Sequence, residues 1–218
     1  EWTPIIRGRN IGGSIDDTGQ KWYIDLDNVD YVDTKSEKVA SELNRFNENK
    51  IICKNIVSSD VKIDATYDDS AADQDIPFLT YDTITNIINH DDSIDDLFLL
   101  GVLTSNAITA YIRELVYSRA TLTMHLDRPY LDPLPIPNIP KESENSDVVS
   151  QSEIADTVEV LISSKKILEE SEYSLSEASE GQYIDAHNNF TQARQDLQEL
   201  VCKAYGLNQE QQLLLLNL

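Results

Sequence analysis

The basic side chains of this acidic chain gather in three short segments, residues 1–13, 45–62 and 113–128. These segments hold nine of the 17 Lys and Arg residues: Arg7, Arg9, Arg45, Lys50, Lys54, Lys62, Arg113, Arg119 and Arg128. Arg and Lys bind phosphates, and Arg can also contact a guanine through two parallel hydrogen bonds. Hydrogen-bonding residues such as Asn55 and Ser58 lie among them. The pattern is typical of a nucleic-acid-binding surface, and ion pairing with the many carboxylates is the alternative interpretation.

No arrangement of side chains indicates catalysis or metal binding. His90, His125 and His187 stand singly, and Cys53 and Cys202 have no clustered ligand beside them. Zinc sites and nucleophilic sites need such groups in close spacing. The seven glycines form no phosphate-binding loop before a helix. We therefore predict no catalytic residue, no metal site and no cofactor in this chain, and two free, partly buried thiols.

The acidic composition admits three interpretations. The chain holds 39 Asp and Glu against 17 Lys and Arg, a formal net charge of −22. Adaptation to molar salt, as in a halophile, is favoured because the carboxylates are spread along the chain and the Debye length at 1 M salt is only about 3 Å. An acidic mimic of nucleic acid is the second interpretation. A calcium site is disfavoured because Asp25, Asp27, Asp30 and Asp33 lack the turn glycine of a calcium loop.

The length of 218 residues and a hydrophobic content of 40% predict a folded protein with a sizeable core. No apolar run reaches the roughly 18 residues of a transmembrane helix, and the N-terminus has no signal-peptide pattern. We expect a cytoplasmic protein with no membrane partner. Because the chain starts at Glu1 and opens into a strand-like run, we also expect it to be part of a longer polypeptide.

Residues 1–92 are predicted to be mainly strands. Apolar runs at Thr3–Arg7, Lys21–Leu26 and Ile51–Val57 are typical of strands, and apolar residues alternate with polar ones from Val61 to Tyr67. A capping box of Thr34 and Glu37 predicts a short helix that reaches Phe46.

From residue 93 onward the apolar spacing becomes helical. We expect helices at Asp95–Leu103 and Ser105–Ser118, and an extended segment over Arg128–Pro140 because proline removes a main-chain donor. Residues 151–218 then show heptad-like spacing on two helices joined at Gly181. Gly206 is expected to end the second of these helices, and Asn208 with Gln211 to cap a last short one.

These elements predict an α+β fold. A strand-rich domain with inserted helices would span residues 1–140, and residues 141–150 would form a linker. Residues 151–218 would form an antiparallel helical hairpin with a short terminal helix.

Five segments carry a further signature in a fixed order. They are Ile5-Ile6-Arg7-Gly8-Arg9-Asn10-Ile11, Lys50-Ile51-Ile52-Cys53-Lys54-Asn55-Ile56, and the stretches at residues 103–112, 130–137 and 200–210. In this order they resemble the C-terminal target-recognition domain of TaqI-like adenine-N6 DNA methyltransferases and of type IIG restriction-modification enzymes. The resemblance covers most of the chain.

The resemblance implies a module that recognises duplex DNA by sequence, beside an adenine-N6 methyltransferase domain with or without a fused endonuclease. That catalytic domain would bind S-adenosylmethionine. Neither its Asn/Asp/Ser-Pro-Pro-Tyr/Phe motif nor its Phe-x-Gly-x-Gly motif occurs here. We therefore expect the methyltransferase domain upstream in the same polypeptide, and we expect this chain to recognise DNA without catalysing a reaction.

The predicted DNA-binding residues combine the basic segments with the resemblance. They are Arg7, Arg9, Lys54, Asn55, Ser58, Lys62, Arg113, Arg119 and Arg128. Arg7, Arg9, Lys54 and Lys62 are the first choices because they lie on or beside the two best-matching strands. The alternatives are a specificity subunit of a multi-subunit restriction system, a non-DNA acidic interaction domain, and the acidic nucleic-acid mimic.

Overall fold

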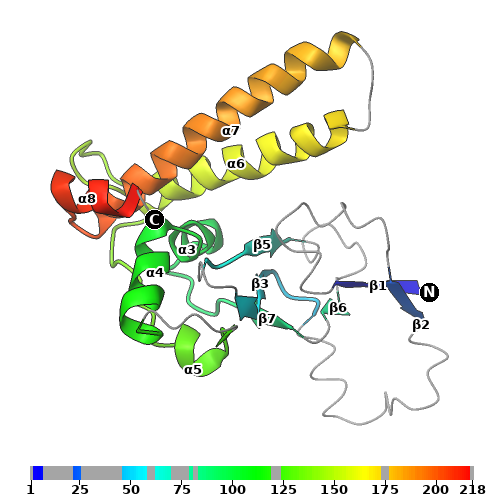
Figure 1. The fold of residues 1–218 in the computed structure, drawn as a ribbon, viewed down its shortest axis with the longest axis horizontal. Coiled ribbons are helices and arrows are strands. Elements are labelled where there is room, and N and C mark those ends of the chain that lie inside the picture. Colours follow the sequence, from blue (N-terminus) through cyan, green and yellow to red (C-terminus); the bar gives the residue numbers. More distant parts are fainter. Residues whose placement is uncertain are drawn as a thin grey trace. The chain divides into compact units, whose positions relative to one another are not determined.

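The structure is a computed structural model, and it describes residues 2–6, 22–25, 46–57, 62–69, 79–80, 83–118, 124–172 and 177–216. The chain divides into two compact units, Glu1–Ile56 with Asp64–Ile88, and Val57–Ile63 with Asn89–Leu218. Most strands lie in the first unit and all described helices lie in the second (Figure 1). The predicted α+β fold class is confirmed. The predicted domain limits stay a prediction, and the two compact units divide at different places.

The first unit contains two small sheets. In one, β1 (Trp2–Ile6) pairs antiparallel with β2 (Trp22–Asp25) and parallel with β6 (Leu79–Thr80). In the other, β3 (Lys50–Lys54) lies between β5 (Ala65–Asp68) and β7 (Ile84–Ile87), antiparallel to both. The strands predicted at Thr3–Arg7 and Lys21–Leu26 are found as β1 and β2.

The central strand β3 forms the core of its sheet. Ile51, Ile52 and Cys53 are buried in succession, because the strand has neighbours on both edges and apolar side chains on both faces. The strand predicted over Ile51–Val57 is interrupted at Asn55, and β4 (Ile56–Val57) follows. The main-chain N–H of Asn55 instead bonds to the carbonyl of Thr83 at 2.8 Å.

Two further predictions in this region are only partly covered. The strand expected from Val61 begins at Ala65, and Ile63 is fully buried without belonging to a strand. The helix expected from Thr34 lies outside the described residues, except Phe46, which lies in a turn.

The second unit begins its helices with two capped segments. Asp95 caps α3 (Asp96–Leu103), and its carboxylate accepts hydrogen bonds from the N–H groups of Leu97 and Phe98 at 2.8 and 2.9 Å. Ser105 caps α4 (Asn106–Tyr111). The helix predicted to reach Ser118 changes into a π-helical segment over Ile112–Val116. Ser118 has a φ of 48°, so the helix ends in a left-handed residue.

The proline-rich segment is not extended throughout. After β8 (Met124–His125), which pairs with β4, residues Arg128–Leu131 form the single turn α5. The expectation of an extended chain from Arg128 is wrong here, because Pro129 lies in the first helical turn, where its missing N–H has no helical partner to lose. Residues 134–140 have no helix or strand, as expected.

A long helical hairpin follows. α6 (Gln151–Glu172) and α7 (Glu177–Ala204) run antiparallel and side by side (Figure 1). Their predicted apolar stripes face the interior, where Ile154, Val158, Ala186, Ala193 and Leu197 are buried. The predicted joint at Gly181 is wrong, because Gly181 lies within α7.

The end of α7 agrees with the prediction. Gly206 adopts a φ of 67°, and the N–H of Leu207 bonds to the carbonyl of Cys202 at 3.0 Å. The N–H of Asn208 then bonds to the Gln211 side chain at 2.9 Å, and the N–H of Gln211 bonds to the Asn208 side chain at 3.0 Å. This reciprocal cap begins α8 (Gln209–Leu216).

Two contacts attach α3 to the hairpin. Gly101 allows close helix packing, since a Cβ atom there would lie 2.8 Å from Val158 Cγ2 and 2.9 Å from Ile154 Cγ2. Gln151 accepts a hydrogen bond from the N–H of Asp95 at 2.8 Å. Its amide nitrogen donates to the carbonyl oxygens of Ser93 and Ile139, each at 3.1 Å. Residues 89–118 therefore share one compact unit with the hairpin.

Candidate nucleic-acid interface

The end of β3 carries two of the predicted DNA-binding residues in the first unit. Lys54 Nζ lies 3.8 Å from a carboxylate oxygen of Asp64, and both side chains are about one-third exposed. The amide nitrogen of Asn55 donates to Thr85 Oγ1 at 3.3 Å. Lys54 thus keeps a partly exposed, weakly paired ammonium group, whereas the Asn55 amide already has a hydrogen-bond partner within the sheet.

Lys50, which belongs to the same basic segment, is not on the surface. Its ammonium lies 2.5 Å from the carboxylate of Asp68, and the two side chains are 0% and 1% exposed. Lys50 also donates to the carbonyl of Phe46 at 2.8 Å. The pair is cross-strand, because Lys50 and Asp68 are register partners in β3 and β5. One of the basic residues counted in the sequence therefore stabilises the interior and cannot reach a ligand.

Lys62 belongs to the second unit and is exposed. Among the described residues, no carboxylate lies within ion-pair distance of its ammonium group. An exposed ammonium group is well suited to neutralise a phosphate.

Arg113 and Arg128 also lie in the second unit, and each has a carboxylate neighbour. Arg113 Nε donates to Glu114 at 3.0 Å, and its side chain is 29% exposed. Arg128 Nε donates to Asp132 Oδ2 at 2.9 Å, and its side chain is 87% exposed. Among the described residues, only Nε of each guanidinium has a hydrogen-bond partner, and the two terminal NH₂ groups of each can point to a ligand.

Two tyrosines bring the regions of these arginines together. The rings of Tyr117, at the end of the π-helical segment, and Tyr130, in α5, lie 5.3 Å apart at a tilt of 55°. The Tyr117 hydroxyl donates to the carbonyl of His125 at 2.8 Å. Burial, with the negative charges that Tyr130 and Asp127 can carry, raises the pKa of Tyr117. Tyr117 therefore acts as a neutral hydrogen-bond donor that holds β8 and α5 beside the preceding helix.

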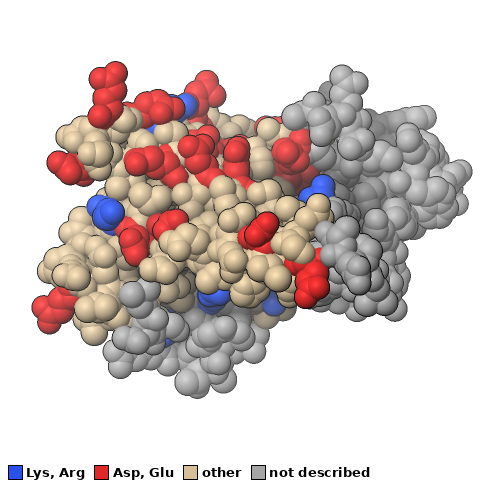
Figure 2. All heavy atoms as spheres, turned by 90° about the horizontal axis from the view of Figure 1, so that it is seen from above, with Lys and Arg blue, Asp and Glu red and all other residues tan. Residues whose placement is uncertain are grey.

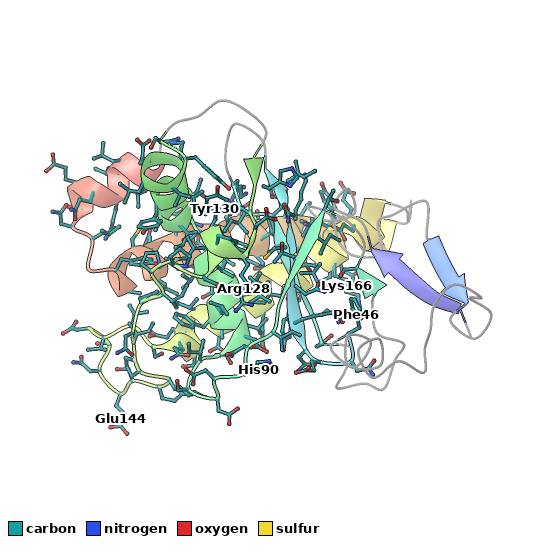
Figure 3. All side chains as sticks on the ribbon, turned by 90° about the horizontal axis from the view of Figure 1, so that it is seen from below. Phe46, His90, Arg128, Tyr130, Glu144 and Lys166 are labelled. Carbon is teal, nitrogen blue, oxygen red and sulfur yellow. The ribbon has the colours of Figure 1, made fainter. Side chains whose placement is uncertain are left out.

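We name this arrangement the α5 corner and define it as Tyr117, His125, Arg128, Tyr130 and Asp132. Arg128 and Tyr130 are labelled in Figure 3. Sequence reasoning found Arg128 but missed Asp132 as its partner. The available signal was the four-residue spacing of opposite charges, which brings two side chains together on one helical turn.

Four predicted residues, Arg7, Arg9, Ser58 and Arg119, lie outside the described residues, and their role in DNA binding stays a prediction. The described ones fall in both units: Lys54 and Asn55 in the first, and Lys62, Arg113 and Arg128 in the second.

Among the described residues, no group of three or more His, Cys, Asp or Glu side chains could hold a metal ion. Both cysteines are free and buried, and burial raises the pKa of Cys53 to about 12, so its thiol is protonated at neutral pH. No helix in the described parts of the chain has the length and hydrophobicity to cross a membrane.

Comparison with known proteins identifies one family. Residues 3–136 match the model of the TaqI-like C-terminal specificity domain. The match covers more than half of the 218 residues; it includes three of the five signature segments in full and the fourth up to residue 136. No curated protein and no solved structure matches the chain. The exposed cations of the described residues are consistent with a domain that confers specificity, and the chain belongs to the family of TaqI-like C-terminal specificity domains.

Proposed function

We propose that this chain recognises a specific sequence in duplex DNA on behalf of a restriction-modification adenine methyltransferase. The observation that carries the proposal is the match of residues 3–136 to a specificity-domain family. The exposed side chains of Lys62 and Arg128 and the partly exposed one of Lys54 support it, because they offer contacts to phosphates and base edges.

In this proposal another domain catalyses the methylation. A methyltransferase domain, in the same polypeptide, would bind S-adenosylmethionine and methylate an adenine taken out of the base stack. The present chain would position that domain by choosing where it binds. Because the sequence lacks both catalytic motifs named above, we assign no residue of this chain to S-adenosylmethionine.

The net charge of −22 opposes DNA binding in dilute buffer. In the described part of the face shown in Figure 2, acidic side chains are much more frequent than basic ones. At molar salt the Debye length falls to about 3 Å, so this repulsion acts only at short range. Binding under those conditions would depend on direct contacts and shape more than on released counterions.

The test is selection from randomised duplex DNA. The 218-residue chain, folded in about 2 M KCl so that its surface charges are screened, is mixed with the duplex pool, and the retained DNA is sequenced. Enrichment of one short motif, with Kd measured on that motif by fluorescence anisotropy, supports the proposal. Failure to retain DNA at every salt concentration that preserves the fold contradicts it, and favours an acidic interaction domain that does not bind DNA.

A further inference from the structure

We infer that Arg128 reads the major-groove edge of a guanine and that Asp132 is the positioning residue that orients it. This inference rests on the proposed function, because it specifies one base contact made by a DNA-recognition module. It is carried by the geometry of the α5 corner.

The Arg128–Asp132 pair presents the correct donors. Asp132 accepts only the Nε hydrogen of Arg128, at 2.9 Å, and among the described residues the two terminal NH₂ groups have no partner. Two parallel N–H donors match the O6 and N7 acceptors of guanine, the commonest specific contact of arginine with DNA. The side chain is 87% exposed, so a base edge could approach it.

The carboxylate favours a base contact over a phosphate contact. A net positive charge on the protein favours phosphate binding, because it releases counterions from the DNA. The charge of Asp132 cancels that of Arg128 and would repel a phosphate. Against this cost, the Nε bond favours one orientation of the exposed guanidinium, which is an advantage for a directional contact. Lys62, with no ion pair among the described residues, is better suited to phosphate.

The backbone that carries Arg128 is held by a ring contact of Tyr130 and by the buried turn that follows α5. A helix of four residues is not stable on its own. The Tyr130 ring packs at 5.3 Å on Tyr117, whose hydroxyl bonds to the carbonyl of His125. Beyond α5, Leu134 is buried and its N–H bonds to the carbonyl of Leu131 at 3.1 Å. Arg128 therefore projects from a turn whose direction is fixed before DNA arrives.

Arg113 is the weaker candidate for the same role. Its guanidinium also uses Nε on a carboxylate, but only 29% of its side chain is exposed. A base edge could approach it less easily than it could approach Arg128.

The experiment repeats the duplex selection with Arg128→Ala, Arg128→Lys and Asp132→Asn. Arg194→Ala removes an exposed arginine on α7 and is the matched control. We expect the wild type to prefer guanine at one position. Arg128→Ala should lower that preference between about 5-fold and 150-fold while leaving the other positions unchanged. Arg128→Lys should not restore it, since lysine lacks the paired donors. Asp132→Asn should reduce the preference for guanine at that position and leave the other positions unchanged.

A second measurement separates a base contact from a structural effect. The selected duplex is prepared with 7-deazaguanine, which lacks the N7 acceptor, at the preferred position. Its Kd should rise about tenfold for the wild type and for Arg194→Ala. It should not change for Arg128→Ala, which has already lost the contact. Circular dichroism melting confirms that each variant folds.

Three results would overturn the inference alone: a uniform loss of affinity in Arg128→Ala across all sequences, no change in that variant, or a wild-type motif without a guanine. Absence of any DNA binding by the wild type would overturn the proposed function and this inference with it.

Discussion

The hydroxyl of Tyr205 donates a hydrogen bond to the carbonyl oxygen of Pro135 at 2.5 Å, across 70 residues of sequence. Pro135 lies inside the range matched by the family model, whereas Tyr205 lies beyond its end. Both belong to signature segments, the fourth and the fifth. The end of the helical hairpin is therefore bonded directly to the specificity region.

Replacing Tyr205 with Phe should destabilise the protein by about 1 kcal/mol, the usual net value of a hydrogen bond. The effect should also depend on pH. Burial raises the pKa of Tyr205, so the folded state favours the neutral phenol. That contribution is complete below the ordinary tyrosine pKa of about 10 and is lost as the pH rises above it, because the unfolded chain then ionises first.

The measurement is the free energy of unfolding in urea at pH 8 and pH 10.5. The wild type should lose more stability between these values than Tyr205→Phe does. Equal losses in the two proteins would show that Tyr205 does not carry the effect.

Replacing Gly101 with Ala should destabilise the second unit by about 1–3 kcal/mol, as overpacking does. The new methyl group would meet Val158 and Ile154 at under 3.0 Å. This cost exceeds the roughly 1 kcal/mol that alanine adds to helix propensity.

Gly181→Ala is the matched control, since nothing lies within 4 Å of a Cβ at that position. It should stabilise the exposed helix α7 by up to about 1 kcal/mol. The free energy of unfolding of both variants is measured by urea denaturation. A similar change of this free energy in the two variants would contradict the packing argument.

Replacing Lys50 alone with Met should destabilise the protein by about 3–5 kcal/mol, because it leaves the Asp68 carboxylate buried without its counter-charge. The double variant Lys50→Met/Asp68→Leu should recover most of this loss. DNA affinity of the folded double variant should equal that of the wild type, although a positive charge has been removed from a basic segment. A clear loss of affinity in the double variant would mean that Lys50 contributes to binding.

Stability should increase with salt. The chain carries a net charge of −22, and screening of its carboxylates weakens their mutual repulsion. We expect the Tm to rise continuously from 0.1 M to about 2 M KCl, over which the Debye length falls from about 10 Å to below 3 Å. Asp156→Asn/Glu159→Gln, which removes two exposed charges on α6, should show a shallower rise. A Tm that is independent of KCl would contradict the prediction, and with it the interpretation of the acidity as an adaptation to molar salt.

Short-range sequence patterns were sufficient to predict much of the helical structure. The cap of α8 and the glycine at the end of α7 depend on a few neighbouring residues, and the sequence predicted both correctly. The apolar stripes of α6 and α7 were also readable, because a helical period of 3.6 residues repeats over many turns.

The incorrect predictions have a common physical cause, which is that packing or local context overrides a general preference. The sequence predicts a helix joint at Gly181, yet α7 continues through it because a single glycine costs only about 1 kcal/mol in a long helix. The prolines predict an extended chain from Arg128, yet the place of Pro129 in the first turn permits a helix. Asn55 breaks a strand that its apolar neighbours would continue.

The sequence predicted which basic residues are candidates for the site, but it predicted their burial and their partners less well. The sequence around Lys50 does not show that its side chain is buried, because its ion-pair partner Asp68 lies on another strand. The Arg128–Asp132 pair, by contrast, is local and could have been found by spacing. The Tyr117–Tyr130 contact joins residues 13 positions apart in the sequence with no shared helical period, and only the three-dimensional arrangement reveals it.

Gln151 joins α3, the proline-rich segment and α6 through three hydrogen bonds. Its amide carries no charge and does not titrate, and all three partners are main-chain groups. The three hydrogen bonds of this junction therefore involve no ionisable group. Screening by salt and side-chain titration act on charged groups, so neither acts directly on this contact between α3, the proline-rich segment and α6.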